Sequence, residues 1–209
     1  MTNAEYSAQT QGKLLQVARR EFARVGYADA GTERIVKLAH MTRGALYHHY
    51  ADKRALFEAV FEELASEIAE RITHAAGRER DPFAALVAGC DAWLDSCLEP
   101  AVRQIVLLDA PAVLGWRRWS EIDARHGTRT LHEGIVACAE AGLLRDADPR
   151  VLTRMLAGAM NDVALMIAES KEAKPLRRKV GDVLHLMLDG LRAPISARPA
   201  RSAHKAAKR

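Results

Sequence analysis

Apolar residues recur at three- and four-residue spacing along most of this chain, and this helical period constrains the fold more than any other feature. Near the start, for example, Leu14, Ala18, Phe22 and Val25 share one helical face. Only 7 prolines and 13 glycines occur in 209 residues, and no segment shows the alternating pattern of a strand. We therefore predict an all-α protein of about nine helices.

Two short helices follow the first long one, and a break suited to a turn separates them. Gly26 is expected to end the first helix, because glycine is common just past a helix C-terminus. The second helix is predicted over Thr32–Ala39, with a break at His40. Thr42 is a good N-cap residue for a third helix that extends to about Tyr50. Three helices so close together, with a turn of about three or four residues before the last, predict a helix-turn-helix.

The remaining helices are longer and carry their own start and stop signals. Asp52 is placed to cap a long helix, and Asp81 followed by Pro82 is typical of another helix start. The helices predicted in this part cover residues 52–77, 81–97, 102–109, 115–141, 149–170 and 176–191, with Pro111 closing the third and a bend near Gly127 in the fourth. No apolar run long enough to cross a bilayer and no leader peptide are recognised, which predicts a cytoplasmic protein.

Charge is distributed unevenly along the chain. Residues 1–54 carry nine Lys and Arg against five Asp and Glu, a net charge of +4. Residues 55–192 carry 17 Lys and Arg against 22 Asp and Glu, a net charge of −5. Residues 193–209 carry five Lys and Arg and no Asp or Glu. A basic first quarter ahead of an acidic body is expected where only the N-terminal part meets a polyanion such as DNA. The last segment lacks apolar periodicity and is predicted to be a disordered basic tail.

The third helix, with the sequence TRGALYHHY over residues 42–50, has the features of a helix that reads the DNA major groove. Residues four apart on a helix share a face, which turns Leu46 and Tyr50 towards the core. Two further rows, Arg43 with Tyr47 and Gly44 with His48, face outward. With their neighbours they offer a guanidinium fork, hydroxyls, an imidazole and two positions with almost no side chain. Together with a lysine at the start of the next helix, the predicted DNA contacts are Thr42, Arg43, Gly44, Ala45, Tyr47, His48 and Lys53. The alternative is that these residues are only the polar, aromatic end of a helix.

Other classes of function find little support in the chain. No nucleophile elbow, phosphate-binding loop, zinc-protease motif or dinucleotide fingerprint is present, so we expect neither an enzyme nor a cofactor. His48 and His49 are neighbours that point about 100° apart on a helix and cannot share one metal ion. The three cysteines show no CxxC spacing and indicate neither a disulfide scaffold nor a zinc site. Cys90 and Cys97 are either small core residues or, since they share a helical face, a redox switch.

The landmarks of the N-terminal segment resemble those of one known family. The residues Gly26-Tyr27, Ile35, Ala39, Met41–Tyr50 and Asp52–Leu56 closely resemble the DNA-binding domain of regulators of the tetracycline-repressor (TetR) type. The resemblance covers residues 11–60. It implies a helix-turn-helix DNA-binding domain over residues 1–51, a ligand-binding and dimerisation domain over 52–192, and the basic tail over 193–209.

The same resemblance implies a function. The protein is expected to be a homodimeric transcriptional repressor that binds palindromic double-stranded DNA and is released by a small-molecule effector. By the family's example, Thr32 and Arg34 of the second helix join the predicted DNA contacts. Two residues depart from the family pattern: Glu33 would repel phosphate, and His40 stands where the turn usually has glycine. The alternative is a non-inducible architectural DNA-binding protein, for which so large an apolar body is unnecessary.

Three tryptophans and a few polar residues of the later helices are the candidates for an effector site. An Asn-Asp pair interrupts a helix that is otherwise apolar, where a polar group needs a ligand, a facing helix or water as its partner. The predicted ligand-binding residues are Trp93, Cys97, Arg103, Trp116, Trp119, Asn161 and Asp162. The alternative is that the tryptophans fill the core and the polar pair lies at a helix crossing.

The last two predicted helices are more apolar than a hairpin on the surface should be. Two such hairpins from two chains would form a four-helix interface, and a dimer supplies the two reading heads that a palindromic operator requires. The predicted interface residues are Leu152, Met155, Leu156, Ala159, Val163, Val180, Leu184, Met187 and Leu188.

Overall fold

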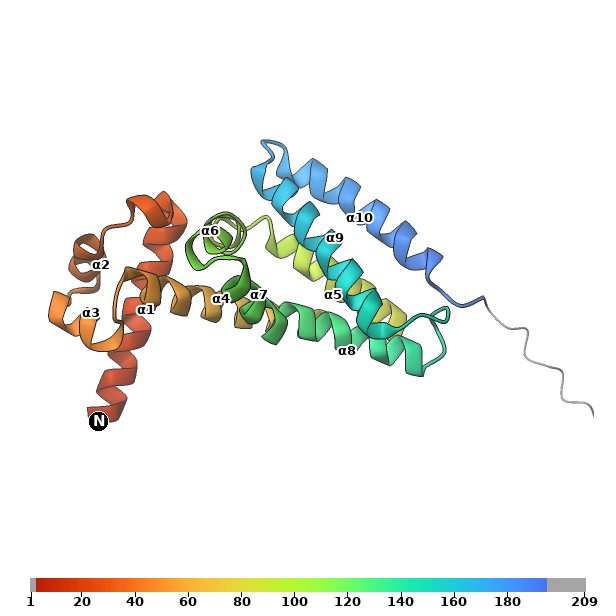
Figure 1. The fold of residues 1–209 in the computed structure, drawn as a ribbon, viewed down its shortest axis with the longest axis horizontal. Helices are drawn as coiled ribbons and strands as arrows, with labels where there is room; N and C mark the ends of the chain where they lie inside the picture. Colours follow the sequence, from red (N-terminus) through yellow and green to blue (C-terminus); the bar gives the residue numbers. More distant parts are fainter. Residues whose placement is uncertain (1–2, 195–209) are drawn as a thin grey trace, which may run out of the picture.

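The computed structural model describes residues 3–194, with side chains from residue 9 onward, and most of these residues are helical (Figure 1). The elements are α1 (Asn3–Asp29), α2 (Thr32–Ala39), α3 (Arg43–His49), α4 (Lys53–Ala76), α5 (Pro82–Ser96), the π-helix η1 (Val102–Asp109), α6 (Ala110–Leu114), α7 (Trp116–Arg125), α8 (Gly127–Glu140), α9 (Pro149–Glu169) and α10 (Ala173–Gly190). The predicted all-α class is confirmed, although residues 3–194 form ten α-helices and one π-helix rather than about nine helices. The predicted disordered tail lies outside the described residues from position 195 on.

The helices gather into two groups. Figure 1 shows α1, α2 and α3 at one end of the molecule and α5, α8, α9 and α10 at the other, with α4 running between them. In the first group Phe22, Ile35 and Leu46 are fully buried together, as expected from their helical spacing. Because α4 packs on α1 and also on α5 and α8, a shared helix rather than a linker joins the groups.

Helix starts follow the capping residues predicted from the sequence. The side chains of Thr42, Asp52 and Asp81 each accept a hydrogen bond from the backbone N–H three residues later, at 3.1, 2.7 and 2.9 Å. Asp148 caps α9 in a similar way, accepting from the amide of Arg150 at 2.8 Å. Each cap satisfies an N–H that has no partner inside its own helix.

The predicted break at Gly26 is confirmed, because Gly26 has the non-helical angles φ 77° and ψ 169° and the regular helix stops there. The label α1 continues to Asp29 because one further helical turn follows this kink. At this kink the amide of Tyr27 donates to the carboxylate of Asp109 at 2.7 Å. A Cβ on Gly26 would lie 3.1 Å from Nε2 of Gln104, so glycine also allows η1 to approach.

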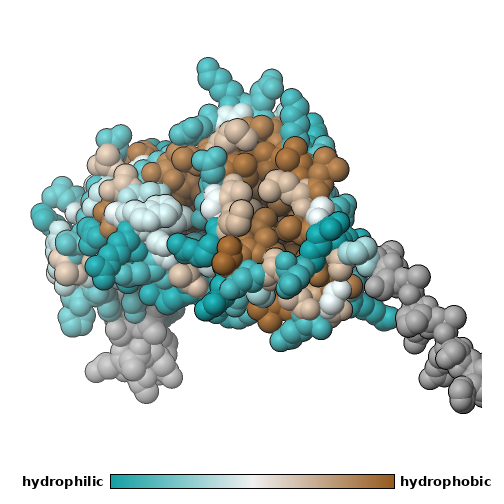
Figure 2. All heavy atoms as spheres, turned by 45° about the vertical axis from the view of Figure 1, so that its right-hand side comes forward, coloured by the Kyte–Doolittle hydropathy of each residue, from teal (hydrophilic) through white to brown (hydrophobic). Residues whose placement is uncertain are grey.

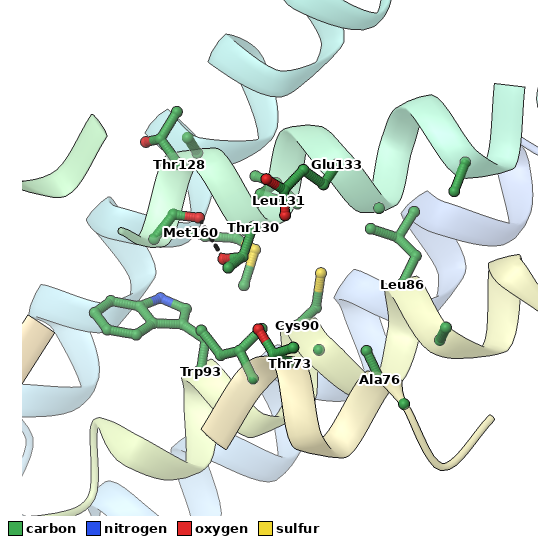
Figure 3. A pocket seen from close by; sticks show the side chains of 18 of the residues that line it. Thr73, Ala76, Leu86, Cys90, Trp93, Thr128, Thr130, Leu131, Glu133 and Met160 are labelled. Carbon is green, nitrogen blue, oxygen red and sulfur yellow. Dashed lines mark hydrogen bonds between the residues drawn. The ribbon is translucent and has the colours of Figure 1, made fainter. Parts of the chain in front are cut away.

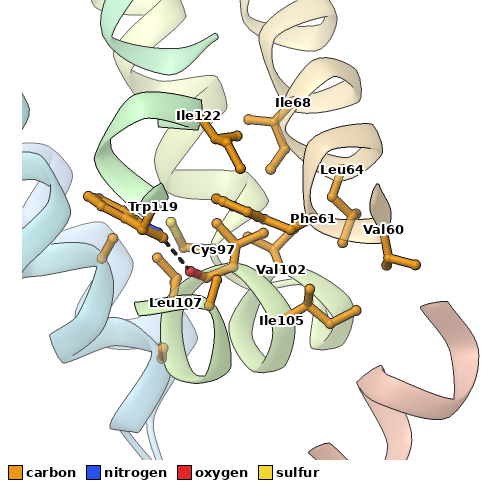
Figure 4. Close-up of a cluster of buried hydrophobic side chains, with 14 of the residues drawn as sticks. Val60, Phe61, Leu64, Ile68, Cys97, Val102, Ile105, Leu107, Trp119 and Ile122 are labelled. Atoms are coloured by element: carbon orange, nitrogen blue, oxygen red, sulfur yellow. Dashed lines mark hydrogen bonds between the residues drawn. The ribbon is translucent and has the colours of Figure 1, made fainter. Parts of the chain in front are cut away.

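The segment predicted as a short α-helix after α5 is the π-helix η1, and Pro111 does not close it but lies in the first turn of α6. The amide of Ala110 donates to the carbonyl of Ile105, five residues back. The next carbonyl, that of Val106, would need an amide on Pro111, which proline lacks. Nε1 of Trp119 donates to the Val106 carbonyl instead, at 3.3 Å (Figure 4).

The helices from α4 to α10, called the body below, share a continuous apolar core to which α4, η1 and α7 contribute. Figure 4 shows Val60, Phe61, Leu64 and Ile68 near Val102, Ile105 and Ile122. The helix predicted over residues 115–141 is two helices, α7 and α8, which meet at His126. Contrary to the expectation from the sequence, one helix of the described range, α9, is long and apolar enough to cross a membrane by length and composition. In this structure α9 packs against η1, α8 and α10.

Candidate DNA-binding surface and internal cavity

α3 exposes most of the residues predicted to contact DNA. The exposed ones are Thr42, Arg43, Gly44, Tyr47 and His48, and the half-buried ones are Thr32, Ala45 and Lys53. Leu46 and Tyr50, on the opposite side, are buried. The ring of Tyr47 is 43% exposed beside a cation and two positions with almost no side chain. Such a surface can approach a phosphate backbone closely and offer it hydroxyl and guanidinium donors.

Arg43 is held by a neighbouring carboxylate. Its guanidinium lies 3.1 Å from the carboxylate of Glu33 on α2, and 6.0 Å from the ring centroid of Tyr47. The side chains of Arg43 and Glu33 are 61% and 79% exposed, so water screens their attraction. Glu33, which was expected to repel phosphate, therefore also occupies the guanidinium that is predicted to contact DNA.

The turn between α2 and α3 holds His40 in the left-handed conformation. With φ 57° and ψ 44°, His40 is the only non-glycine residue of the described range at positive φ. Its amide donates to the carbonyl of Lys37 at 3.1 Å, and the amide of Met41 donates to the carbonyl of Val36 at 2.8 Å. These bonds close α2 as a glycine would. Histidine thus leaves the turn geometry unchanged, at a cost of about 1–2 kcal/mol in backbone strain.

Two more predicted DNA contacts are engaged within the protein. Nζ of Lys53 donates to the carbonyl of Ala28 at 3.2 Å and lies 4.4 Å from the ring centroid of Tyr27. Arg34 forms an ion pair with Glu21, at 2.9 Å, and Glu21 itself is buried. Arg34 on α2 and Lys53 at the start of α4 flank α3 in the chain, and both contact residues of α1 in the free protein.

The body contains a cavity of about 370 Å³ between α4, α5, α8 and α9, with one wall residue from α7 (Figure 3). Two of the residues predicted to bind a ligand, Trp93 and Asn161, line it. Its wall is mostly apolar, and the other polar side chains on it are Thr73, Asp123, Thr128, Thr130 and Glu133. A concave, mostly apolar space with a few polar groups is the usual form of a small-molecule site.

The other predicted ligand residues lie outside this cavity. Cys97 is fully buried, and Arg103 donates to a backbone carbonyl of α9 at 3.0 Å. Trp119 is buried against η1, and Trp116, which is 68% exposed, stacks on it with ring centroids 5.0 Å apart. Asp162 is exposed on α9. Trp119 therefore supports the π-helix, and only Trp93 of the three tryptophans faces the cavity.

Four further residues line the cavity without having been predicted from the sequence: Thr73, Thr128, Thr130 and Met160. These residues come from different helices that meet only in the folded chain, so no short pattern marks them. A weaker signal was available in glycines placed inside helices, where glycine is unfavourable. Gly89 and Gly134 both line the cavity, and a Cβ on either would come within 3.3 Å of a neighbouring side chain.

The cysteines show the properties of core residues. Burial raises the pKa of the Cys90 and Cys97 thiols to about 12 in each case, so both stay protonated at neutral pH. A protonated, buried thiol reacts slowly, which favours the core interpretation over the redox switch. Within the described part of the chain, no three His, Cys, Asp or Glu side chains lie together as metal ligands would.

α4 connects the DNA-binding surface to the cavity. Near its start, Arg54 donates to two backbone carbonyls of α6, both at 3.2 Å. One turn later Glu58 pairs with Arg118 of α7 at 2.6 Å. Glu62, about one further turn along, lies 3.0 Å from Nε2 of His126. The last turns of α4 line the cavity, so a shift of this helix would change the geometry of both sites.

α9 and α10 leave an apolar face uncovered in the single chain. The exposed large apolar residues on it are Val151, Met155, Leu165 and Met166 of α9, with Val183, Leu186 and Met187 of α10. Figure 2 shows apolar side chains gathered over much of the body. Among the predicted interface residues, Met155, Ala159 and Met187 are exposed, Leu152 and Val163 are half-buried, and Leu156, Val180, Leu184 and Leu188 are buried within the chain.

A small helix-turn-helix with an exposed reading helix, joined through α4 to a larger helical body, defines the class of DNA-binding transcriptional regulators. The chain belongs to the TetR family of such regulators. Residues 14–60 match the family described as "Bacterial regulatory proteins, tetR family", and residues 83–191 match the one described as "Tetracyclin repressor-like, C-terminal domain". The resemblance inferred from the sequence is thereby confirmed.

Individual relatives agree with this assignment. A TetR-family transcriptional regulator from Pectobacterium atrosepticum is 33% identical, with a TM-score of 0.80 over 93% of this chain and 99% of that one. An HTH-type transcriptional repressor of Mycobacterium tuberculosis is 41% identical over 75 residues, which are 36% of this chain and 38% of the repressor. FadR from Bacillus subtilis, solved in complex with stearoyl-CoA, shares the fold at 16% identity, with a TM-score of 0.72 over 86% of this chain and 98% of that one.

Proposed function

We propose that this protein is a ligand-responsive transcriptional repressor that binds a palindromic operator as a homodimer in the cytoplasm. The observation that carries the proposal is the outward row of α3, where Arg43 and Tyr47 flank the small residue Gly44. A helix exposed in this way fits the major groove, and its guanidinium can form two hydrogen bonds with a guanine. The name of the mycobacterial relative, a transcriptional repressor, supports repression.

The uncovered face of α9 and α10 supports the homodimer. Seven large apolar side chains are exposed on these two helices, and a large exposed apolar area is characteristic of an interface. A two-fold axis would bring the same face of each chain together. The exposed members of this face, rather than the buried residues predicted from the sequence alone, would make the contact between chains.

The internal cavity supports an effector that releases DNA. A ligand weakens DNA binding only if it binds more tightly to the conformation whose reading heads are wrongly spaced. α4 is the proposed lever, because its first turn lies beside the DNA-binding surface and its last turns line the cavity. A tilt of α4 would move two heads off the spacing of one DNA turn, about 34–36 Å. In FadR from Bacillus subtilis the bound molecule is stearoyl-CoA, which is precedent for a ligand on this fold.

The proposal is tested by selecting an operator from a random-sequence pool with the purified protein. We expect an inverted repeat to be enriched and bound far more tightly than unrelated DNA at physiological salt. Binding that depends on salt but not on sequence would instead favour the architectural DNA-binding protein. The same operator then reports whether a small molecule lowers the affinity.

The oligomeric state is tested by light scattering on variants of the uncovered face. Leu186→Glu places a charge on a side chain that is 72% exposed and should produce monomers that bind one half-site weakly. Arg117→Glu, at a side chain 95% exposed on α7, is the matched control and should remain a dimer. Wild-type protein that is monomeric at micromolar concentration would contradict the proposed homodimer.

A further inference from the structure

The wall of the cavity carries negative groups and no positive ones. Asp123 and Glu133 are the charged side chains among the residues that line it, and no lysine, arginine or histidine belongs to this set. A ligand carboxylate or phosphate would therefore enter a mostly apolar space and meet a charge of the same sign without a counter-ion. Desolvation and repulsion would both oppose it.

Asp123 is held in place but remains available to a ligand. Its Oδ2 accepts a hydrogen bond from Oγ1 of Thr128 at 2.6 Å. Its Oδ1 accepts none from the described residues, and it lies 3.0 Å from the position where a Cβ on Gly127 would be. Any side chain at residue 127 would crowd this carboxylate, so glycine leaves space beside it.

The environment of Asp123 only partly stabilises its negative charge. Burial raises the pKa of this carboxyl above its usual value, although the Thr128 hydrogen bond and the nearby Arg154 and His126 act in the opposite direction. A buried carboxylate with an incomplete set of donors gains most from a donor that carries a positive charge.

Glu133 does not share these properties. Its side chain is 60% exposed, and its carboxylate pairs with Arg129 at 3.0 Å. It therefore lies at the rim of the cavity with its charge already compensated and screened by water. Of the two acidic groups on the wall, Asp123 is the one that a buried ligand would use.

The apolar part of the wall indicates the rest of the ligand. Figure 3 shows Trp93 and Thr128 towards one side of the cavity and Leu86 with Ala76 towards the other. Asp123 bonds to Thr128, so the carboxylate, the hydroxyl and the indole belong to the same end. An indole ring can also attract a cation. The opposite end, with Leu86 and Ala76, offers apolar contacts to a hydrocarbon body.

We infer that the cavity selects an apolar molecule with one protonated nitrogen, which pairs with Asp123, and discriminates against carboxylates of the same shape. The inference rests on the proposed function, in which this cavity is the effector site, and it names the chemical class of that effector.

The test uses three probes with the same phenylbutyl body, 4-phenylbutylamine, 4-phenylbutanol and 5-phenylpentanoate, titrated into the full-length protein by calorimetry. We expect the amine to bind at least about tenfold more tightly than the carboxylate, with the alcohol between them. Asp123→Asn should bring the amine and carboxylate within about threefold of each other. Glu133→Gln, the matched control, should keep the full preference, and unchanged binding of the alcohol reports an intact cavity in each variant.

The inference is overturned if the carboxylate binds as tightly as the amine, if the preference survives in Asp123→Asn, or if none of the three probes binds at millimolar concentration. Release of operator DNA is measured separately. An amine that binds through Asp123 without changing DNA affinity would leave this inference standing and contradict the proposed effector role. A carboxylate that binds in the cavity and releases DNA would support the proposed effector role and contradict this inference.

Discussion

The DNA-binding domain turns its functional side chains outward from one short helix, whereas the body encloses its candidate site between several helices. In the first, Leu46 is fully buried while Arg43 and Tyr47, its neighbours on α3, are exposed. In the second, Trp93 and Asn161 face a space that no single helix defines. One site therefore depends on the spacing of residues along nine positions, and the other depends on how five helices pack.

The two regions also differ in how much a small displacement matters. The residues predicted to contact DNA on α3 belong to one short helix, which Leu46 anchors in the core beside Ile35. The cavity changes shape whenever any of its helices moves, because each contributes only a few wall residues. A ligand bound as proposed would therefore act on the body more readily than on the DNA-binding domain, and α4, which packs on α1 as well as on α5 and α8, is the proposed connection between them.

The largest expected effect tests whether the two regions unfold separately. Leu46→Ala removes a side chain that is fully buried under α3 and should cost about 2–5 kcal/mol of folding free energy. Hydrogen exchange should show α2 and α3 losing protection while α8 and α9 keep it. Ile135→Ala, a matched change at a fully buried position of α8, should have the opposite pattern. Equal loss of protection in both regions for both variants would mean that α4 makes the chain one cooperative unit.

The next effect is on DNA binding and leaves the fold unchanged. Arg43→Ala and Tyr47→Ala should each weaken operator binding by about 1–3 kcal/mol, because each removes a donor from the reading surface. Fluorescence anisotropy at physiological salt measures the loss, and circular dichroism checks the fold. Arg117→Ala, an exposed arginine of the body, should bind the operator as the wild type does. Unchanged affinity in Tyr47→Ala would show that α3 presents a different face to DNA.

The DNA-binding domain could be predicted from the sequence because the residues that shape it are close together in the chain. Thr42 and Asp52 cap their helices with side chains three residues from their partners, a spacing that the chain displays directly. The outward rows of α3 follow from the helical period once Leu46 is assigned to the core. Gly26 shows where local patterns stop: the break at this residue was predicted, but the helical turn after it is held by Asp109, far along the chain.

The body could be predicted only in outline, because its details depend on contacts between distant residues. η1 is a π-helix whose carbonyl at Val106 is satisfied by the indole of Trp119, a pairing that no local pattern signals. For the same reason, Trp119 was a candidate for ligand binding although it supports the core. The seven residues predicted to bind a ligand include only two on the cavity wall, and that assignment itself remains a prediction.

A smaller effect concerns backbone strain at the turn between α2 and α3. The other residues at positive φ in the described range are Gly26, Gly115 and Gly142, whereas the turn of the head uses His40. His40→Gly should relieve about 1–2 kcal/mol of strain and lose part of that to the freer unfolded chain, a net stabilisation of about 0.5–1 kcal/mol. Thermal unfolding measures it. Lys37→Gly, in the last turn of α2, is the matched control and should be destabilising by about 0.5–1 kcal/mol. A destabilised His40→Gly variant would mean that the contacts of the imidazole stabilise the fold by more than the backbone strain costs.

The smallest expected effect concerns the carboxylate that holds Arg43 in the free protein. Glu33→Gln removes the charge 3.1 Å from the Arg43 guanidinium, so the arginine no longer has to leave a partner when it meets DNA. Both side chains are largely exposed and water screens their attraction, so we expect operator binding to tighten by only about 0.5 kcal/mol. Anisotropy titrations at two salt concentrations measure the gain, which should shrink at higher salt because mobile ions already weaken the pair. Glu140→Gln removes an exposed carboxylate at the end of α8 and controls for the change in net charge. Weaker binding in Glu33→Gln but not in Glu140→Gln would reverse the interpretation, since Glu33 would then hold Arg43 in the orientation that DNA requires.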